Sequence, residues 1–400
     1  MPRTVLCLLT AAALCVLGCR TASKTQTLRP TESPTPASTI ALNRGEPIII
    51  GVSAALGGDQ SNLGNDIADA AELAVIDRGG SLRGHPLEIR RMDDGCTDAE
   101  KAVAVARSFA KLSGLAGIIG PMCTTGAQAA DGAYEGAHVV HILPAATRSD
   151  LSQQGERYLF RTAWRDDAQA AVQAGYGIND LGAKSVVLID DGDPYGKTLA
   201  DAFSGFFQAA GGRVLSRERV QRGTTDFSGI ARQVKSADPP LVVFEGLNPE
   251  GALTLKALRA SGFTGKFIAP DGVLNAQVLA AAGASGADGA ILTGGAMPDP
   301  AFVGRFHDRF GRNPSTPFVL QSHDAVSMLI DAIDAEATEH SDGTLVIDRE
   351  QLAAKLRSER FTGVTGTIQF DEHGDRHGSA AAELGLTIYR VMNGRFEVVR

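Results

Sequence analysis

The sequence has few aromatic residues, no run of basic residues and no C-x-x-C cysteine pair. Aromatic side chains make up 6% of the 400 residues, and Trp occurs once. The five cysteines include no C-x-x-C pair, and the formal net charge is −8 without any run of basic residues. Proteins that bind nucleic acid need a basic surface, often with aromatic residues interleaved. We therefore expect no nucleic-acid partner.

Apolar runs long enough to cross a membrane are also missing. One run, Val5 to Leu17, follows a single arginine. It is shorter than the ~20 apolar residues that span a bilayer, and its layout is that of a secretory signal. The run ends in Gly18-Cys19, which resembles a bacterial lipobox, whose cysteine becomes the lipid-modified first residue. We expect a signal peptide over residues 1–18 and a lipid on Cys19; the alternative is an ordinary signal peptide with a chance cysteine.

Residues 19–46 are rich in Ser, Thr and Pro and hold few apolar side chains to bury. Such a composition predicts a disordered tether. The folded part is then expected to run from Pro47 to Arg400. About 350 residues exceed what one hydrophobic core usually covers, so we expect two lobes.

The folded part alternates apolar runs with helical patterns. Runs such as Val186–Ile189 and Leu241–Phe244 suit strands that helices cover on both faces. The pattern predicts a doubly wound α/β architecture, used twice. Strands are expected near residues 47–56, 87–92, 116–120, 138–143, 158–162, 184–190, 213–220, 240–245, 265–269 and 289–294.

The order changes after Gly294. Three helices are expected in succession, near residues 299–311, 317–336 and 349–358. Two hairpins are expected to close the chain, the first over GTIQFDEHGDR and the second with Asn393-Gly394 at its tight turn.

Two cysteines, Cys96 and Cys123, remain once the signal and the lipid site are set aside. An even number in an exported domain suggests a disulfide. Each follows a predicted strand, and loops at the carboxyl ends of neighbouring strands can meet. A bridge here would stabilise the fold by ~3–4 kcal/mol through chain entropy. Two buried free thiols are the alternative.

The stretch VVLIDDGDPYGKT, Val186 to Thr198, comes close to a phosphate-binding loop, G-x-x-x-x-G-K-[ST]. That motif needs glycine five residues before Gly196, where this sequence has Asp191, preceded by Asp190. Two carboxylates would repel a phosphate and occupy the N–H groups that should hold it. No G-x-G-x-x-G follows the first strand either. We therefore do not expect a nucleotide enzyme.

Ligands of doubly wound sheets bind beyond the carboxyl ends of the strands. The loops expected there contain hydroxyls, carboxylates and glycines, but no Ser/His/Asp set and no cluster of metal ligands. His373 and His377 flank a predicted turn, and we interpret them as solvated loop residues. We expect no enzymatic activity, no cofactor and no metal. The strand-end loops are 57–59, 122–126, 144–147, 190–196, 245–249 and 270–272.

Six segments together resemble the extracytoplasmic substrate-binding proteins of branched-chain amino-acid ABC importers. They are DDGCTDAEKAVAVA, GPMCTTGAQAA, PAAT, DDGDPYGKTLA, APDGVLN and GVTGTIQFDEHGDR. The resemblance covers most of residues 47–400. It implies the type I periplasmic-binding-protein fold, in which two Rossmann-like lobes are joined by three hinge crossings and bind the ligand between them. It also implies the Cys96–Cys123 bridge.

The resemblance places the three crossings near Ala163–Trp164, near Gly294–Gly295 and near Glu383. The first lobe is then expected to comprise residues 47–163 plus 295–383. The second is expected to comprise residues 164–294 plus 384–400.

The resemblance also implies site residues. Thr124 matches a Ser/Thr that binds the ligand α-carboxylate, and it opens a predicted helix, where free N–H groups favour an anion. Ala145 and Thr147 match residues that contact both the carboxylate and the amino group. Asp271 stands where the family has an acidic residue for the α-ammonium, in a charge-assisted hydrogen bond. Tyr195 matches a tyrosine that covers the ligand when the lobes close.

Simpler interpretations of these residues stay open. Thr124 and Thr147 are also compatible with helix caps or turns. Asp271 is compatible with a turn before Gly272, and Tyr195 with core packing.

The sequence departs from the family in the side-chain pocket. Leu63 and Leu247 occupy loops in which the family often has aromatic residues. Trp164, near the first crossing, and Phe318, near the rim, are the candidates to compensate. Related binding proteins also take amides and aromatic acids, so another ligand class is an alternative.

The resemblance implies a lipid-anchored, extracytoplasmic, monomeric binding protein. It would capture a small ligand, a branched-chain or other hydrophobic amino acid first, and present it to an ABC permease by hinge closure. The alternatives are a sensor that signals ligand state to a membrane receptor, an α/β enzyme, and a structural surface lipoprotein.

Overall fold

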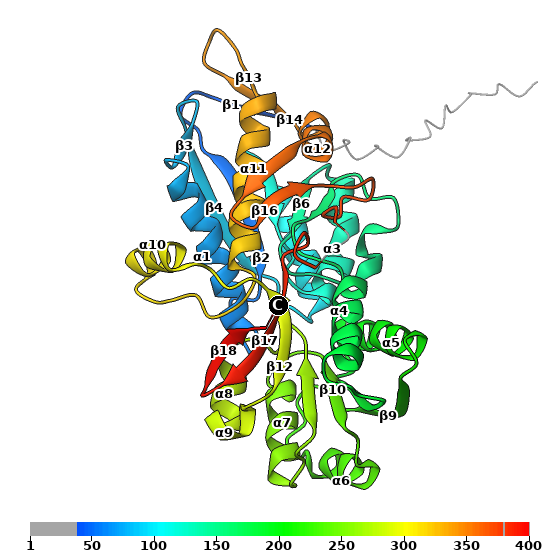
Figure 1. Ribbon diagram of the computed structural model, residues 1–400. Coiled ribbons are helices and arrows are strands. Elements are labelled where there is room, and N and C mark those ends of the chain that lie inside the picture. Colours follow the sequence, from blue (N-terminus) through cyan, green and yellow to red (C-terminus); the bar gives the residue numbers. More distant parts are fainter. Residues whose placement is uncertain (1–37, 379–380, 400) are drawn as a thin grey trace, which may run out of the picture. The chain divides into compact units, whose positions relative to one another are not determined.

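A computed structural model describes residues 38–378 and 381–399 (Figure 1). The expected signal peptide, Cys19 and most of the expected tether lie outside the described residues. The described residues form one compact unit, which contains two large sheets. None of the described helices is both long and apolar enough to cross a membrane.

The first large sheet has six strands in the order β3-β4-β2-β5-β6-β7. Its strands are β2 (Ile48–Ala54), β3 (Ser81–Leu82), β4 (His85–Asp93), β5 (Leu115–Ile119), β6 (Val140–Leu143) and β7 (Leu159–Arg161). Strand β3 forms an antiparallel pair with β4, and the other neighbours are parallel. The helices of this lobe are α1 (Ser61–Asp77), α2 (Ala99–Phe109), α3 (Thr124–Gly136), α10 (Pro300–Phe310), α11 (Val319–Glu336) and α12 (Arg349–Ser358), with a 3₁₀ turn, η1 (Ser149–Ser152).

Alternate side chains of β2 show how helices cover both faces of this sheet. Ile48, Ile50 and Val52 belong to the core that contains α1 and α11. Ile49 packs instead with α2 and α3. A strand buried on both faces reads as a continuous apolar run, as β2 does.

The second large sheet has seven strands in the order β18-β17-β12-β11-β10-β8-β9. Its strands are β8 (Ser185–Asp190), β9 (Arg213–Arg219), β10 (Leu241–Glu245), β11 (Lys266–Ala269), β12 (Ile291–Gly295), β17 (Leu386–Met392) and β18 (Arg395–Val398). Strands β8 to β12 are parallel, and β17 and β18 add an antiparallel edge. The helices here are α4 (Asp166–Asn179), α5 (Pro194–Ala209), α6 (Ser228–Ala237), α7 (Glu250–Ala260), α8 (Ala276–Ala282) and α9 (Ala284–Ala287).

Strand β10 is again covered on both faces. Leu241 and Val243 belong to the core with α4 and α5, whereas Val242 and Phe244 pack with α7. The two sheets share one connectivity, since β4-β2-β5-β6-β7 and β9-β8-β10-β11-β12 have the same order relative to the chain. The predicted fold of two doubly wound α/β lobes is therefore confirmed.

The chain passes between the sheets three times: from β7 into α4, from β12 into α10, and into β17 near the C-terminus (Figure 1). The residue boundaries given for the two lobes stay predictions.

Ordered structure begins earlier than expected. Strand β1 (Thr39–Leu42) lies in the stretch predicted to be a disordered tether and pairs antiparallel with β14 (Leu345–Asp348). A further short strand, β13 (Thr338–Glu339), completes this small sheet. Ile40 and Leu42 are buried, so these four residues have the period-2 alternation of a strand with one buried face. The prediction of a tether through residue 46 is therefore wrong for these residues.

The chain turns back within GTIQFDEHGDR as predicted: Phe370 and Arg376 form an antiparallel bridge, and the Asp371 N–H donates to the Asp375 carbonyl oxygen at 2.8 Å. A further hairpin, which was not predicted, lies directly before it. Its strands are β15 (Arg360–Gly363) and β16 (Gly366–Gln369), so its turn is Val364–Thr365. The backbone N–H groups of both turn residues donate to the buried Asp324 carboxylate, at 2.7 and 2.9 Å. The second hairpin is as predicted, with Asn393 and Gly394 at positive φ in its turn.

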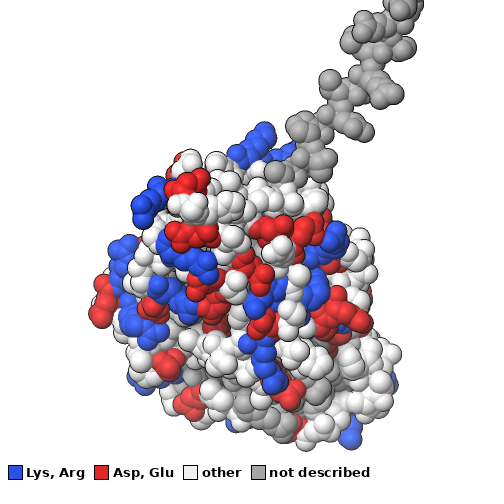
Figure 2. Space-filling view, turned by 90° about the horizontal axis from the view of Figure 1, so that it is seen from above, with Lys and Arg blue, Asp and Glu red and all other residues white. Residues whose placement is uncertain are grey.

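The face seen from above carries both signs of charge (Figure 2). Lys and Arg side chains are interspersed with Asp and Glu over the atoms drawn in colour, so this face shows no basic stripe of the kind that nucleic acids require.

Candidate ligand-binding site

The carboxyl ends of the parallel strands carry the loops that build the site. In a sheet with this strand order, a crevice opens where neighbouring strands send their connections in opposite directions. That point lies between β2 and β5 in the first sheet and between β8 and β10 in the second. The loops that leave these four strands begin at Ala55, Gly120, Asp191 and Gly246.

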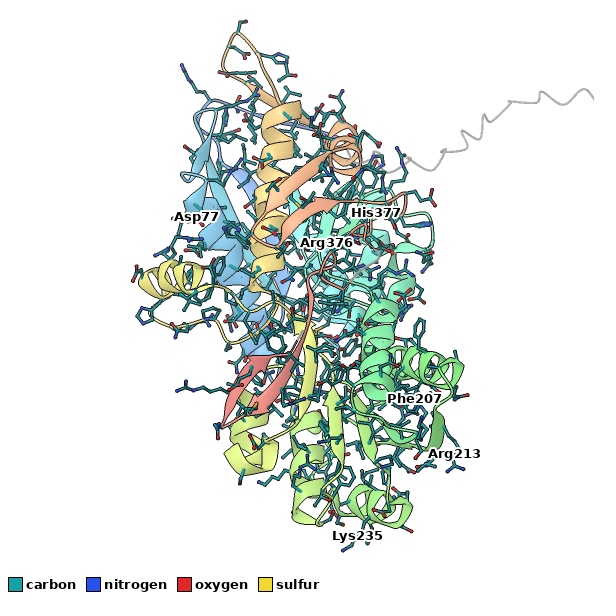
Figure 3. The ribbon with its side chains drawn as sticks, viewed as in Figure 1. Asp77, Phe207, Arg213, Lys235, Arg376 and His377 are labelled. Atoms are coloured by element: carbon teal, nitrogen blue, oxygen red, sulfur yellow. A yellow bond between two sulfur atoms is a disulfide. The ribbon has the colours of Figure 1, made fainter. Side chains whose placement is uncertain are left out.

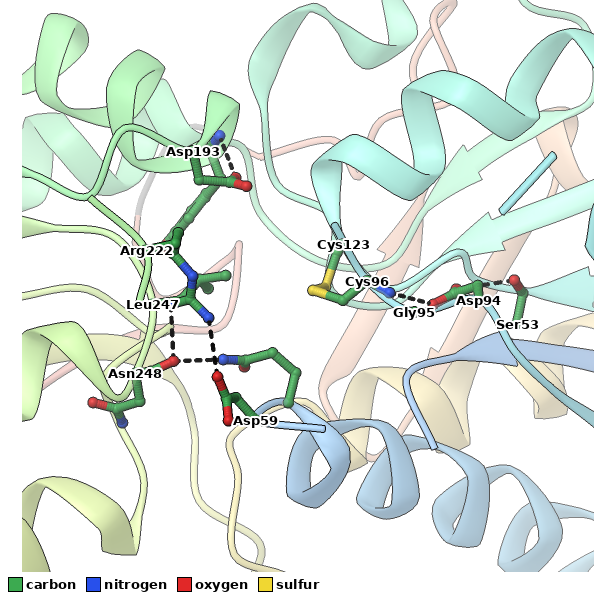
Figure 4. Close-up of a disulfide and its surroundings, with 12 residues drawn as sticks. Ser53, Asp59, Asp94, Gly95, Cys96, Cys123, Asp193, Arg222, Leu247 and Asn248 are labelled. Atoms are coloured by element: carbon green, nitrogen blue, oxygen red, sulfur yellow. Dashed lines mark hydrogen bonds and ion pairs between the residues drawn. A yellow bond between two sulfur atoms is a disulfide. The ribbon is translucent and has the colours of Figure 1, made fainter. Parts of the chain in front are cut away.

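Thr124 opens helix α3 directly after a disulfide. Cys96 and Cys123 are bonded, which confirms the predicted bridge. Cys123 is the N-cap residue of α3, and its side chain makes no capping hydrogen bond. The loop on the Cys96 side is held by Asp94, which accepts from the Cys96 N–H at 2.9 Å and from Ser53 Oγ at 3.0 Å (Figure 4). The bridge thus fixes a helix N-terminus whose N–H groups lack a side-chain cap.

Ala145 and Thr147 lie in the loop after β6, and both are buried. The carbonyl oxygen of Thr147 accepts from the N–H of Asp166 at 2.8 Å. The hydroxyl of Thr147 is buried and has no hydrogen-bond partner. This hydroxyl is therefore available to a ligand.

Arg161 holds the loop after β6 in place, a role that was not predicted from the sequence. Its side chain is fully buried and donates to the carbonyl oxygen of Arg148 at 2.7 Å and to Asp375 Oδ1 at 2.8 Å. Ser152 Oγ lies 2.9 Å from Arg161 Nη2 and donates to Asp375 Oδ2 at 2.8 Å. No local pattern marks this set, because Asp375 lies more than two hundred residues from its partners.

The second lobe contributes Tyr195 and Asp271. The Tyr195 hydroxyl donates to Asp271 Oδ1 at 3.0 Å, and both residues are buried. A Cβ on Gly272 would lie 2.8 Å from the Leu247 side chain and 3.3 Å from the Tyr195 ring, so these groups are packed together. Burial raises the pKa of Asp271 to about 6, against the lowering effect of Gln169 and Tyr195. The structure thus brings three predicted site residues of this lobe together.

The loop that resembles a phosphate-binding loop has its N–H groups occupied by carboxylates. Asp191 accepts from the Leu247 N–H at 2.9 Å and from the Asp193 N–H at 3.1 Å. Asp193 in turn caps α5 by accepting from the Tyr195 N–H at 3.0 Å. Gly196 is required because a Cβ there would lie 2.6 Å from the carbonyl oxygen of Glu245. Gly196 therefore allows α5 to pack closely against the end of β10, and the loop places Tyr195 in the site.

Apolar residues of both lobes lie around these polar groups. Ala145, Tyr195 and Leu247 belong to one continuous core, and the partly buried Leu63 packs against it. Trp164 and Phe318 stack in the same core, with ring centroids 5.1 Å apart, and are both 1% exposed. Trp164 Nε1 donates to Gln169 Oε1 at 2.9 Å. Phe318 is thus a buried partner of Trp164, not a residue at an exposed rim.

The two lobes are in direct contact at this site. Gln60, just before α1, donates to the carbonyl oxygen of Asn248 at 2.7 Å. Arg222 donates to the same oxygen at 3.0 Å and lies 3.9 Å from Asp59 of the first lobe (Figure 4). The described arrangement is therefore a closed one, which explains why predicted site residues from both lobes are buried.

Two further buried carboxylates lie here, and the sequence analysis did not assign them to the site. Asp166 begins α4 and is 2% exposed, and Glu245 ends β10 and is 0% exposed. Neither carboxylate has a hydrogen-bond partner for either oxygen. Burial raises the pKa of Asp166 to about 8; the charge of Asp271 adds to this shift, and the nearby Thr147 hydroxyl opposes it.

Burial also raises the pKa of Glu245 well above its ordinary value. The charges of Asp166 and Asp271 add to the shift, and the nearby Gln173 amide opposes it. A strand-end position in a predicted cleft loop was the available signal for Glu245. Asp166 had none, because an aspartate at a helix start looks like a cap.

The two histidines singled out in the sequence lie in the segment after β16. His377 is exposed and stands beside Arg376 (Figure 3), and His373 has a side chain that is 40% exposed. Elsewhere among the described residues, Asp131, Glu135 and His141 offer ligand atoms within 4.8 Å of one another. His141 Nε2 lies 3.2 Å from Asp131 Oδ1, and Glu135 accepts two backbone N–H groups. Local hydrogen bonds account for this grouping.

The site joins complementary groups on opposite lobes. The first lobe offers a helix N-terminus, which suits an anionic group, and an unpartnered hydroxyl, which can donate or accept. The second lobe offers buried carboxylates, which suit a cation with hydrogen-bond donors. Helices α3 and α5, which carry Thr124 and Tyr195, are in contact. A small zwitterion would satisfy both halves at once.

Comparisons with known proteins identify the family and similar chains. The profile of the family described as "Periplasmic binding protein" matches residues 47–394. The leucine-, isoleucine-, valine-, threonine-, and alanine-binding protein of Pseudomonas aeruginosa is 30% identical over 307 residues, which cover 76% of this chain and 79% of that protein. The solved leucine binding protein of Thermotoga maritima is 26% identical with a TM-score of 0.78, over 88% of this chain and 98% of that one.

A fourth comparison concerns the fold alone. A branched-chain amino acid transporter substrate binding protein of Streptococcus pneumoniae, solved with isoleucine, is 24% identical. It matches with a TM-score of 0.77 over 88% of this chain and 99% of that one.

Proposed function

Because the chain belongs to the periplasmic binding protein family, we propose that it captures an α-amino acid between its lobes and delivers it to an ABC importer. Proteins of this family bind solutes outside the cytoplasm, and the work is done by closure of the lobes. Contacts from the ligand to both lobes favour the closed state, which the permease then recognises.

One observation carries the amino-acid part of this proposal. The Asp271 carboxylate, bonded to Tyr195, is buried close to Asp166, and Asp166 is bonded through its backbone to Thr147 of the other lobe. An ammonium group between Asp271 and the Thr147 hydroxyl would supply donors to groups that lack them. The ligand carboxylate would then face the N-terminus of α3 at Thr124, where N–H groups and the helix dipole favour an anion.

The names of the relatives provide reference ligands for the side chain. Leucine, isoleucine and valine are named for the Pseudomonas protein, and leucine for the Thermotoga protein. Leu63 and Leu247 offer this chain apolar surface for a hydrophobic or branched-chain side chain. Tyr195 and Leu247 come from the second lobe and Leu63 from the first, so closure would enclose the side chain.

A thermal-shift screen tests the function. The mature chain, with its disulfide intact, is heated with each of the twenty amino acids and with amides, aromatic acids and nucleotides. A ligand at 100 times its dissociation constant should add ~2.7 kcal/mol of stability. We expect at least one amino acid to raise the melting temperature. A shift only with nucleotides, amides or aromatic acids would contradict the amino-acid proposal.

The same proposal covers points that the described residues do not reach. We propose a lipid anchor at Cys19, a monomer in solution and no enzymatic activity. Metabolic labelling with a fatty acid, compared between the wild type and Cys19→Ser, tests the anchor. A sensor would share this site and differ in its output; loss of amino-acid uptake when the chain is deleted supports import and contradicts sensing alone.

A further inference from the structure

Two buried carboxylates of the described residues differ from all the others. The buried side chains include a dozen Asp and Glu residues. Asp166 and Glu245 are the members of this set that have no hydrogen-bond partner for any side-chain oxygen. A buried carboxylate without donors is strongly disfavoured. The group then stays protonated or acquires its donors from a ligand.

The position of Glu245 in its strand makes it conspicuous. Leu241 and Val243, on the same face of β10, pack in the apolar core with α4 and α5. The next residue on that face is Glu245, so a carboxylate stands where the alternation calls for an apolar side chain. It therefore lies on the face towards α4, which carries Gln173, and α5, which carries Tyr195.

A second unpartnered group points at the same place. Gln173 is 0% exposed and lies close enough to Glu245 to lower the pKa of that carboxyl. Its Nε2 donates to Thr293 Oγ1 at 3.0 Å, but its Oε1 has no partner. The Gln173 amide and the Glu245 carboxylate therefore lie side by side, and none of the charged groups that shift the pKa of Glu245 is a cation.

One ligand ammonium is too few donors for this set. Asp166, Asp271 and Glu245 influence one another's protonation. An α-ammonium at Asp271 and Thr147 can also reach towards Asp166, since Asp166 is bonded to Thr147 through its backbone. Glu245 would still lack a counter-charge, and an aliphatic side chain would leave it without one.

We propose that Glu245 and Gln173 form a subsite for a second positively charged nitrogen, so that the captured amino acid carries an amine or guanidinium on its side chain. This inference rests on the proposed amino-acid function and narrows its ligand class. The aliphatic stem of such a side chain would run along Leu247, two residues after Glu245, and Leu63 of the other lobe.

Titration calorimetry with matched ligands tests the inference. The mature chain is titrated with lysine, ornithine and arginine, and with norleucine, which has the stem of lysine without its amine. We expect lysine, ornithine or arginine to bind at least about 30-fold more tightly than norleucine, the loss typical when one partner of a buried charge pair is removed. Glu245→Gln should abolish this preference. Glu372→Gln, at a carboxylate that is 87% exposed, is the matched control and should keep it.

The outcomes separate the inference from the function on which it rests. If leucine and norleucine bind as tightly as the basic amino acids, or Glu245→Gln keeps the preference, the subsite is wrong and the amino-acid function stands. If no amino acid binds and an amide or aromatic acid does, both fail. Circular dichroism and thermal unfolding of Glu245→Gln show whether the variant is folded. If it is not, Gln173→Leu is the second variant, and it should weaken lysine binding and spare norleucine.

Discussion

Buried carboxylates that hold the fold differ from three that lie in the cleft, Asp166, Glu245 and Asp271. Asp66 is 0% exposed and accepts from the Ser315 N–H at 2.7 Å, from Thr316 Oγ1 at 2.9 Å and from Arg312. Asp375 likewise accepts hydrogen bonds at both oxygens, from Arg161 and from Ser152. In the cleft, by contrast, Asp271 has one side-chain donor, while Asp166 and Glu245 have none.

The difference shows which carboxylates hold the fold and which are free to bind. A buried carboxylate whose oxygens all have hydrogen-bond donors stabilises the folded chain, because removing it leaves those donors without their acceptor. A buried carboxylate that lacks donors destabilises the ligand-free chain unless it is neutral. The cleft groups are therefore the ones whose free energy a ligand can change.

The largest expected loss of stability follows from removing a buried carboxylate that has its full set of donors. Asp375→Ala leaves the guanidinium of Arg161 buried without its counter-charge, which typically destabilises by about 3–5 kcal/mol. Urea unfolding measures it. A loss below about 1 kcal/mol would contradict the assignment of this pair to fold stability. Asp150→Ala is the control, because the Asp150 side chain is 60% exposed.

Next comes the disulfide beside the site. Replacing both cysteines, Cys96→Ser with Cys123→Ser, should lower the free energy of unfolding by about 3–4 kcal/mol, because the sequence separation is 27 residues. Ligand affinity should fall as well, since the bridge fixes the start of α3. Unfolding with and without reductant measures the first effect. A double variant as stable as the oxidised wild type would contradict it.

A smaller effect, with a characteristic sign, concerns pH. The pKa of Asp166 is raised to about 8, so the folded state keeps a proton that the unfolded state releases above pH ~4. This contribution to stability is present at low pH and is lost as pH rises towards 8, by at most about 1.4 kcal/mol per pH unit.

Asp166→Asn should flatten this part of the profile in the ligand-free chain. The stability contribution of Asp190 should depend on pH in the opposite way. Burial raises the pKa of Asp190, but the hydrogen bonds from Arg219 and Arg217 lower it by more, so the net shift is downward. Its contribution is therefore present above pH ~4 and is lost on acidification. Unfolding of both Asn variants between pH ~2 and ~8 compares the two, since Asp190 acts below pH ~4 and Asp166 above it. Equal slopes in the two variants would refute the distinction.

The smallest effect is expected for the tyrosine hydroxyl beside Asp271. Tyr195→Phe removes the hydroxyl that donates to Asp271 Oδ1 at 3.0 Å and keeps the ring. Losing this one hydrogen bond should weaken ligand binding ~3- to 10-fold. Calorimetric titration measures it. Unchanged affinity would mean that the ligand replaces this donor completely.

Much of the fold followed from the sequence because its signals are local. Buried parallel strands are continuous apolar runs, so the strands that line the cleft lie close to their predicted positions. Strand β1 was missed because four alternating residues carry little signal and its partner, β14, lies some three hundred residues away. The β15–β16 hairpin was missed because Asp324, on another element, fixes its turn.

The site followed from the sequence only in part. Thr124, Ala145, Thr147, Tyr195, Leu63, Leu247 and Asp271 were named from a resemblance, and their roles in binding stay proposals. Asp166 and Glu245 escaped notice because a carboxylate at a helix start or a strand end is ordinary in a sequence. Only packing shows that such a group is buried and has no donor.

The most direct test of the account is a titration of Asp271→Asn. The amino acid that gives the largest thermal shift is titrated into the wild type and into this variant, which keeps the shape of the side chain and removes its charge. We predict that the ligand-free variant is at least as stable as the wild type at pH 7, because the buried charge is gone. Its affinity should be at least about 30-fold lower, because the ligand ammonium loses its buried counter-charge. A variant that binds the amino acid as tightly as the wild type would contradict capture in this cleft.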